Sequence, residues 1–449
     1  MVDEISALLS LINTSARSLE RGYTDERGRV PSLDDTEPHP LDGQISSPEM
    51  REAVQVLEGA CAQLCATLAR PNHTVLNKFF MTALEPSCLR VALNCKIPDI
   101  LQHKPAGMHV ADIGKICGVD APKLARILRL LSAKHCFQEV ERDVFANTRL
   151  SVQLLSANPL YSLGLHMTED TTQGATQLAE TLADAEWGPS TDPAHSAFNK
   201  VTNQPLPMFD FWAQDPEMQS HGTRFGIGML GWGTAVEAEA VVRAYPWHAL
   251  PRGATVCDLG GGVGAMAIAL ARAHPHLRLK LQDLPARMAQ ARAVVWPAEC
   301  PAALAEDRIE FKAIDFFAEA PIAGCDVYYL KNILHAFPAA ECRTILKGVR
   351  QAMKPGSRVL IHEYTLQTAG RSALQQQLTH APAPLLGNYG AGRIRQYHLD
   401  VSLMVLVNGG ERTLEEYVQL AEEAGLRFVR VWEFGDMNGV ELCAGEGEC

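Results

Sequence analysis

The sequence predicts an α/β protein in which a doubly wound, mostly parallel sheet follows a mainly helical winged-helix region. From Thr255 onward, short apolar runs alternate with helical patterns, which is typical of parallel strands joined by helices. The first run, TVCDL, leads into a cluster of glycines and then into a helix of small residues. Upstream, residues 75–165 carry helical patterns followed by two short strand-like runs.

The N-terminal part begins with apolar residues at positions 5, 8, 9 and 12, a spacing that predicts a helix over residues 1–20. Residues 21–50 are polar and rich in proline, which predicts a flexible linker. A second helical pattern runs from Pro48 to about Ala69. The chain is therefore expected to open with a helix, a linker and another helix.

Residues 75–165 match the pattern of a winged helix-turn-helix. SCLRVALNCKIPDILQH predicts one apolar helix, HVADIGKICGVDAPKLARILRLLSAKHC predicts two helices around a glycine turn, and FQEVERDVFANTRLS predicts two short strands. Many such units bind DNA, and Lys123, Arg126 and Arg129 fit that alternative. The same helix has a wide apolar stripe and the chain carries a net charge of -12, so we expect packing and no nucleic-acid partner.

Residues 166–250 predict a helical connector that is rich in aromatic side chains. These side chains either line a pocket for an apolar or aromatic small molecule or form a core between domains, and both alternatives stay open. The aromatic residues are Phe198, Phe209, Phe211, Trp212, Phe225 and Trp232.

Composition narrows the class of protein. With 47% hydrophobic and 20% charged residues, the chain resembles an ordinary globular protein. It has no long apolar run and no signal-peptide pattern, so we expect no membrane partner and a cytoplasmic location. The 12 cysteines are scattered, without a CxxC pair or a Cys/His cluster. This distribution predicts a reduced protein without a metal site.

A candidate cofactor loop follows the strand that ends near Asp258. Gly260, Gly261 and Gly262 allow a ligand to approach the backbone closely, at the strand end where doubly wound folds bind ligands. The run DLGGGVG departs from the dinucleotide fingerprint GxGxxG, and an acidic residue precedes it. Asp258 suits a ligand with an ammonium or sulfonium group better than one with a diphosphate.

Acidic residues at the next two strand ends extend this candidate site. Asp283, followed by Leu284, is placed to accept both hydroxyls of a ribose, although a turn or helix cap is the alternative. Asp315 can accept from an adenine amino group and Phe316 can lie against the ring, unless they form a solvated turn with a core aromatic. Together these residues fit S-adenosyl-L-methionine better than NAD.

The motifs DLGGGVG, LQDLP, DFF, LKNILHAF and NGGERTLEEYVQLAEEAG occur in this order, and together they resemble the plant and fungal small-molecule O-methyltransferases of the caffeic-acid type. The similarity covers about residues 50–440 and fits the fungal secondary-metabolism branch. It implies a winged-helix domain used for dimerisation, followed by a methyltransferase domain. The expected parts are 1–50 (helix and flexible linker), 51–165 (winged-helix dimerisation domain), 166–250 (helical connector lining the substrate pocket) and 251–449 (cofactor-binding methyltransferase domain).

The resemblance also implies site residues. His335 matches the catalytic base, Glu363 and Glu411 match two carboxylates that flank it, and Lys331 matches a cofactor position. An imidazole with a pKa of about 6.5 can accept a phenol proton near neutral pH, and a carboxylate can fix its tautomer. The implied activity is methyl transfer from S-adenosyl-L-methionine to a hydroxyl of an aromatic or polyketide-like small molecule, carried out by a homodimer.

Two departures from the family pattern keep other functions open. Ala336 and Phe337 replace the usual Asp-Trp after the histidine, which removes a carboxylate beside the base. The stretch from about Gly370 to His398, before a helix expected near Leu399, looks like an insertion that forms either a lid or an inert surface loop. A pericyclase of the same fold, which binds the cofactor without transferring its methyl group, is the main alternative. A non-catalytic cofactor-binding protein is another.

Overall fold

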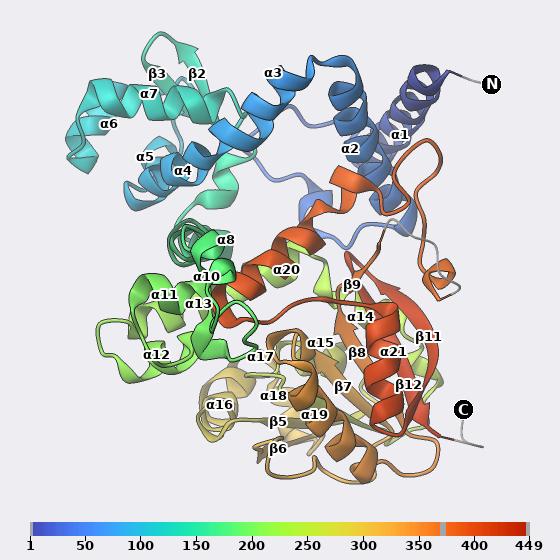
Figure 1. Cartoon of the computed structure of the whole chain (residues 1–449). Coiled ribbons are helices and arrows are strands. Elements are labelled where there is room, and N and C mark those ends of the chain that lie inside the picture. The colour runs from blue at the N-terminus through green and yellow to red at the C-terminus, as the bar shows by residue number, and fades with distance from the viewer. Residues whose placement is uncertain (1–2, 369–373, 446–449) are drawn as a thin grey trace. The chain divides into compact units, whose positions relative to one another are not determined.

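The computed structural model describes residues 3–368 and 374–445, which fold into two compact units (Figure 1). The first unit runs to Ala235 and includes Val405–Val407, and the second takes the rest of the chain from Val236. Residues 236–250, which the sequence assigned to the connector, belong to the second unit. Their apolar side chains explain this, because Val241 and Trp247 are fully buried in a core cluster that also contains Val256.

The first unit begins with two helices that pack on each other, α1 (Glu4–Arg27) and α2 (Pro48–Leu68). Helix α2 matches its prediction. Helix α1 extends beyond residue 20, so the predicted linker is in part helical. This helix ends where Gly28 adopts a left-handed conformation with φ 76°. The remaining short elements here are η1 (Pro40–Gly43), α3 (Pro71–Val75), η2 (Leu76–Phe80) and η3 (Met81–Ala83).

The winged-helix prediction is confirmed, with one correction. The predicted single helix of SCLRVALNCKIPDILQH is two helices, because Lys96 has a φ of 49° and interrupts it. The apolar stripe faces inward, since Leu124 and Leu128 are fully buried. The elements are α4 (Leu84–Asn94), α5 (Ile97–Leu101), β1 (Met108–His109), α6 (Val110–Cys117), α7 (Ala121–Ser132), β2 (Phe137–Glu141) and β3 (Val144–Asn147), with the strands in the order β1-β3-β2.

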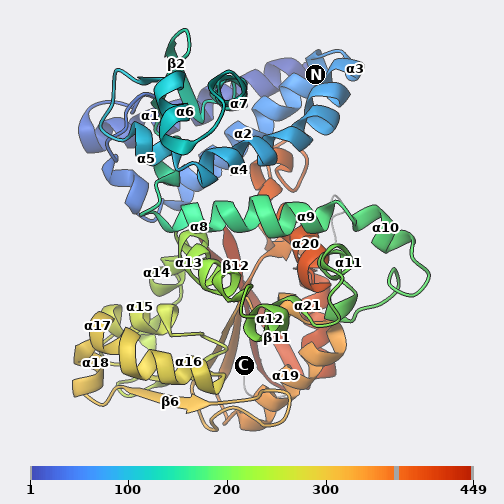
Figure 2. The ribbon, with the colours of Figure 1, turned by 90° about the vertical axis from the view of Figure 1, so that its left-hand side faces the viewer.

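The rest of the first unit is helical. Figure 2 shows α8, which continues through a π-helical turn into α9, as one long rod. Helix α13 packs on α8 through glycines, because a Cβ on Gly231 would lie 2.8 Å from the backbone nitrogen of Leu160. The elements are η4 (Ser151–Leu154), α8 (Pro159–His166), η5 (Met167–Thr171), α9 (Thr172–Ala175), α10 (Leu178–Ala183), η6 (Pro193–His195), α11 (Ala197–Thr202), α12 (Met208–Gln214) and α13 (Gln219–Ala235).

The aromatic residues of this region form a cluster around Trp212, which is 2% exposed. Its ring lies 5.9 Å from that of Phe225 and 6.2 Å from that of Phe198. Phe209 joins the cluster but is 46% exposed. Within the first unit the aromatic side chains therefore behave mainly as core, and a pocket-lining role for them stays a prediction.

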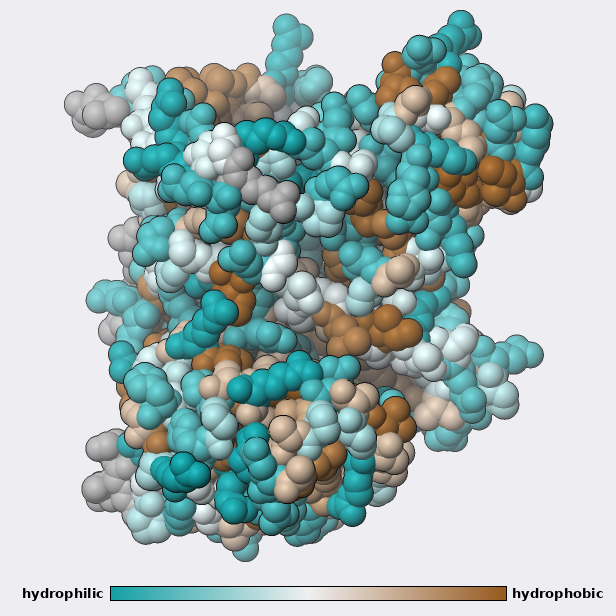
Figure 3. Space-filling view, turned by 180° about the vertical axis from the view of Figure 1, so that it is seen from behind, coloured by the Kyte–Doolittle hydropathy of each residue, from teal (hydrophilic) through white to brown (hydrophobic). Residues whose placement is uncertain are grey.

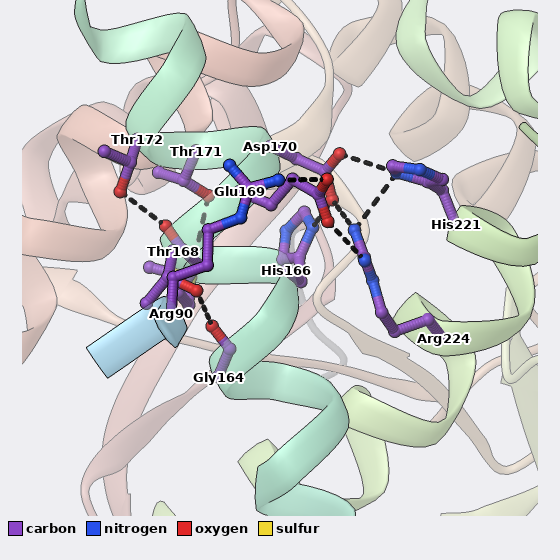
Figure 4. A network of polar contacts seen from close by, with 11 residues as sticks. Arg90, Gly164, His166, Thr168, Glu169, Asp170, Thr171, Thr172, His221 and Arg224 are labelled. Carbon is purple, nitrogen blue, oxygen red and sulfur yellow. Dashed lines mark hydrogen bonds and ion pairs between the residues drawn. The ribbon is translucent and has the colours of Figure 1, made fainter. Parts of the chain in front are cut away.

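A buried polar network lies beside this cluster, at the π-helical turn (Figure 4). The Asp170 carboxylate contacts His166 Nδ1 at 2.9 Å, His221 Nδ1 at 2.8 Å and the Arg224 guanidinium at 2.7 Å. Arg224 also donates to Glu169 at 2.6 Å. Since Asp170 is 3% exposed, its charge depends on these partners for stabilisation.

The second unit contains a seven-stranded sheet in the order β11-β12-β8-β7-β4-β5-β6. Strands β4 to β8 are parallel, and β12 pairs antiparallel with both β8 and β11, so the predicted mostly parallel sheet is confirmed. The strands are β4 (Thr255–Leu259), β5 (Arg278–Asp283), β6 (Ile309–Ala313), β7 (Val327–Lys331), β8 (Arg358–Glu363), β11 (Leu426–Phe434) and β12 (Met437–Ala444). A separate two-stranded ladder joins β9 (Thr365–Leu366) and β10 (Arg412–Thr413).

Helices cover both faces of this sheet (Figure 2). Side chains alternate between two cores: Tyr329 packs in one and Tyr328 in the other. Helix α20 begins at Ile394, earlier than the predicted Leu399. The helical elements are η7 (Ala238–Ala240), α14 (Val241–Ala244), η8 (Trp247–Ala249), α15 (Ala265–Ala273), α16 (Pro285–Gln290), η9 (Ala291–Val295), α17 (Trp296–Glu299), α18 (Pro301–Ala305), η10 (Leu334–Ala336), α19 (Ala339–Ala352), η11 (Gln375–Gln377), η12 (Gly390–Arg393), α20 (Ile394–Val407) and α21 (Leu414–Glu423).

The predicted insertion is partly described, since residues 370–373 lie outside the described residues. The part from Leu374 is held by side chains around Gln367. The Gln367 amide donates to the Thr379 carbonyl at 2.9 Å, and the Tyr397 hydroxyl donates to the Gln367 carbonyl at 2.5 Å. Tyr389 within the segment is 1% exposed. These contacts tie the described part of the segment to Gln367, and whether it forms a lid or an inert surface loop stays a prediction.

No helix within the described ranges is long and apolar enough to cross a bilayer. On the face that Figure 3 shows, hydrophobic residues form separate patches among hydrophilic ones. The described residues also contain no group of three or more His, Cys, Asp or Glu side chains placed to hold a metal ion.

Candidate active site

Four predicted site residues lie at the carboxyl ends of neighbouring parallel strands in the second unit. Asp258 is in β4, Asp283 ends β5, Lys331 ends β7 and Glu363 ends β8. Because parallel strands finish at a common edge, the sheet brings these side chains into one region. The other predicted residues lie in loops or short turns, with Asp315 and Phe316 after β6 and Glu411 after helix α20.

At two positions the glycine loop has no room for a side chain. A Cβ on Gly261 would lie 2.4 Å from the Asp258 carboxyl carbon, and one on Gly260 would lie 2.4 Å from Ile333 Cδ1. Gly260 and Gly262 also have φ values of 74° and 61°, which other residues rarely adopt. The bare backbone of this loop is therefore free to lie directly against a ligand.

Asp258 places a buried carboxylate oxygen against the glycine loop, since a Cβ on Gly261 would lie 2.5 Å from Asp258 Oδ2. It is 2% exposed, and its Oδ2 atom has no hydrogen-bond partner among the described residues. Burial raises the pKa of this carboxyl to about 7, although the nearby Lys331 ammonium acts in the opposite direction. An unpartnered buried acceptor beside an open glycine loop fits the cationic end of S-adenosyl-L-methionine.

Asp283 connects the glycine loop to the next helix. Its Oδ2 accepts from the Gly262 N–H at 2.8 Å and its Oδ1 accepts from the Leu284 N–H at 2.7 Å. The carboxylate therefore has the local role that the turn alternative predicts, and each oxygen keeps a second lone pair for a ribose. The Leu284 side chain is 60% exposed.

The two residues predicted to face adenine take different positions. Asp315 Oδ1 accepts from the Phe317 N–H at 3.0 Å, so this carboxylate stabilises its own turn. The Phe316 ring packs edge-on against Phe317 and Phe337, with centroid separations of 4.9 and 5.8 Å. Phe337, which replaces the family tryptophan, thus keeps an aromatic contact with the candidate cofactor region.

Lys331 is a partly buried cation whose charge interacts with two carboxylates, those of Asp258 and Glu363. Burial lowers the pKa of its ammonium group, while the charges of Asp258 and Glu363 act to raise it. The net direction is downward, so desolvation dominates. Its position at the end of β7 places it beside the strand end that carries Asp258.

His335 and Glu411 form a buried pair. His335 Nδ1 lies 2.7 Å from Glu411 Oε1, and the two residues are 8% and 6% exposed. Burial alone would lower the pKa of His335, but the Glu411 carboxylate outweighs it and the pKa lies above its usual value. With Nδ1–H donating to the carboxylate, Nε2 is left with a lone pair that can accept a proton.

Glu363 lies next to the His335 turn, and its hydrogen bonds go to the backbone and to a tyrosine. Its Oε1 accepts from the Ile333 and Leu334 N–H groups at 2.7 and 2.6 Å, and its Oε2 accepts from the Tyr417 hydroxyl at 2.6 Å. The carboxylate therefore holds the backbone just before His335 instead of contacting the imidazole. Tyr417 was not identified from the sequence, because its packing on β8 depends on where α21 lies.

The segment that carries Glu411 also contacts the His335 turn through its backbone. The Gly410 N–H donates to the His335 carbonyl at 2.9 Å, and a Cβ on Gly409 would lie 2.4 Å from that oxygen. Arg412 donates to two further carbonyls of the turn. The double glycine before a charged pair in NGGER was the available signal for this close approach.

No carboxylate replaces the family aspartate directly at Ala336. A further acid of this region is Asp400 of α20, whose Oδ1 accepts from the Glu411 N–H at 2.9 Å. Burial raises the pKa of Asp400. This carboxylate therefore orients the Glu411 backbone, and sequence reasoning missed it because it lies on a different helix.

Comparisons with known proteins agree with this architecture. Residues 190–427 match the O-methyltransferase domain model, and residues 78–157 match the O-methyltransferase dimerisation domain model. The chain is 40% identical to 3-O-methyltransferase 2 of Phanerochaete chrysosporium over 98% of this chain and 97% of that protein.

Solved structures give the same fold. The mitomycin 7-O-methyltransferase MmcR is 25% identical, with a TM-score of 0.66 over 84% of this chain and 98% of that one. A pericyclic reaction enzyme has a TM-score of 0.69 over 96% of this chain and 98% of that one, but at 19% identity it shows a shared fold alone. From the domain match, the 40% identical relative and the site geometry, the chain belongs to the O-methyltransferase family and is an S-adenosyl-L-methionine-dependent enzyme.

Proposed function

We propose that His335 is the base for methyl transfer to a hydroxyl of an aromatic or polyketide-like small molecule. The buried contact between His335 Nδ1 and Glu411 carries this proposal, because it fixes the tautomer in which Nε2 can accept a proton. S-adenosyl-L-methionine, when bound, supplies an electrophilic methyl group and a neutral thioether leaving group. As the substrate oxygen bonds to that methyl carbon, its proton passes to His335 Nε2.

The other predicted site residues bind the cofactor or orient His335. Glu411 stabilises the imidazolium that forms, and Glu363 holds the turn in place through two backbone N–H groups. Cofactor binding falls to two groups of residues. The backbone of Gly260–Gly262 would lie against the cofactor, and the side chains that would contact it are Asp258, Asp283, Leu284, Asp315, Phe316 and Lys331.

The nature of the acceptor and the assembly rest on the comparisons. The relative from Phanerochaete chrysosporium is named for methylating one numbered oxygen, which supports an acceptor with a defined hydroxyl position. The proposal includes a role in secondary metabolism. The dimerisation-domain match, together with Phe79 and Phe80 at 70% and 68% exposure, supports a homodimer.

The activity is tested by incubating the protein with S-adenosyl-L-methionine labelled on its methyl group and a panel of phenols. We expect labelled ether products and one S-adenosylhomocysteine per product. Phenols already methylated at the reactive hydroxyl serve as the control and should take no label. Conversion of an acceptor that requires the cofactor but consumes none would identify a pericyclase instead and overturn methyl transfer.

Cofactor binding has its own test at Asp283. We expect Asp283→Ala to weaken S-adenosyl-L-methionine binding about 10- to 100-fold, as for the loss of a hydrogen bond to a charged group. Isothermal titration calorimetry measures this directly. Glu310→Ala removes an exposed carboxylate of the same sheet and should leave the affinity unchanged. Equal affinities for Asp283→Ala and the parent would remove the ribose assignment.

A further inference from the structure

We propose that Arg412 is a positioning residue that holds His335 at the correct distance from Glu411. Its guanidinium donates to the Leu334 carbonyl at 2.8 Å through one terminal nitrogen, and to the Phe337 carbonyl at 2.6 Å through the other. These carbonyls stand on either side of His335 in the chain. The proposal rests on the proposed role of His335 and adds a residue that the family resemblance did not assign.

The turn needs such support because it is short. Residues Leu334–Ala336 form a single 3₁₀ turn, closed by backbone bonds from Ala336 and Phe337 of 3.2 and 3.1 Å. Glu363 satisfies the N–H groups at its start, and Arg412 satisfies carbonyls at its start and end. The negative Glu363 therefore holds N–H groups of the turn, and the positive Arg412 holds carbonyl groups. A planar guanidinium has separate nitrogens that can each bond to a different carbonyl, whereas the ammonium of a lysine carries all its donors on one nitrogen.

Arg412 also couples the turn to the segment that supplies Glu411. Gly410 donates to the His335 carbonyl, and Glu411 contacts His335 Nδ1. Arg412 donates to the carbonyls of Leu334 and Phe337, on either side of His335. Three consecutive residues thus contact one turn. Because Glu411 lies between two of these anchors, loosening Arg412 lets the Glu411 carboxylate and the imidazole separate. The carboxylate is what keeps the His335 pKa above its usual value against burial.

The test compares Arg412→Lys and Arg412→Ala with the parent enzyme. We expect kcat to fall about 10- to 100-fold in Arg412→Ala and by a smaller factor in Arg412→Lys, as for a misplaced catalytic group. The affinity for S-adenosyl-L-methionine should stay unchanged, which also reports that the variants fold. Arg343→Ala removes an arginine from an exposed ion pair of the same unit and should behave as the parent.

A direct readout separates this inference from the activity itself. The His335 ring is titrated by NMR, with its signal assigned by comparison with His335→Gln. In both Arg412 variants the titration midpoint should move downward, by a larger step in Arg412→Ala. Parent-like midpoints in folded variants, or full activity in Arg412→Lys, would overturn the positioning role. If His335→Ala retained activity, the base assignment would fail, while the shifted midpoint would still report the role of Arg412.

Discussion

His335→Ala is expected to lower kcat by about 10²- to 10⁴-fold, the usual contribution of a positioned general base. Cofactor affinity should be unaffected, because the described contacts of His335 are to Glu411 and to the backbone of Gly410, outside the glycine loop. Steady-state kinetics with a phenol from the labelled panel measure the loss. His248→Ala, which removes an exposed histidine of the same unit, is the matched control. Methylation at the parent rate would show that another group takes the proton.

The same assignment fixes the sign of the pH dependence. A base must be neutral to act, and the pKa of His335 lies above its ordinary value of 6.5, so kcat should fall as the pH drops through a midpoint higher than 6.5. In Glu411→Gln the carboxylate that raises this pKa is gone while burial remains, so the midpoint should move to lower pH. A kcat profile that does not change between parent and Glu411→Gln would contradict the coupling of the pair.

Asp170→Asn is expected to destabilise the protein by about 3–5 kcal/mol, the usual effect of breaking a buried charged pair by removing one partner. The Asp170 carboxylate contacts two histidines and Arg224 while 3% exposed, and a neutral amide of similar shape cannot compensate the guanidinium. Denaturant unfolding followed by tryptophan fluorescence reports this, since Trp212 lies beside His166. Asp112→Asn alters an exposed pair of the same unit and should leave the midpoint unchanged.

This network also has a defined pH dependence. Burial alone would raise the pKa of Asp170, but the bond from His166 and the charge of Arg224 outweigh it and the pKa lies below its usual 3.8. Its stabilising contribution is therefore present above the unfolded value and is lost as the pH falls through the lower folded value. In Asp170→Asn this acid-dependent loss should disappear. Parent-like stability of the variant at neutral pH would contradict a stabilising role for the network.

The sheet was predictable because its strands are short apolar runs that alternate with helices, and burial on both faces leaves few other structures for them. The boundaries of the helices were harder to predict from the sequence. The break at Lys96 depends on one residue adopting a left-handed conformation, and the early start of α20 at Ile394 depends on how the preceding segment packs. Hydrophobic patterns carry little information on either point.

For the site, the strand pattern singled out Asp258 and the family resemblance singled out His335 and Glu411, and their roles stay predictions. The partner of a given oxygen was not predictable. Glu363 bonds to backbone groups 29 and 30 residues earlier in the chain, and that choice depends on the distance between β7 and β8 ends. The contacts of Arg412 were not predictable either, because a charged residue after a glutamate gives no sign that its side chain will donate to two backbone carbonyls.

The place of β12 in the sheet has a consequence for the synthesis of the chain. Strand β8, whose last residue Glu363 anchors the His335 turn, pairs with β7 on one side and with β12 on the other. Residues Met437–Ala444 leave the ribosome only after α20, α21 and β11 have been made. Until then the growing polypeptide has a strand, β8, with an open edge and an apolar centre, and open strand edges are templates for aggregation. Chaperone demand during production should therefore be greatest late in translation.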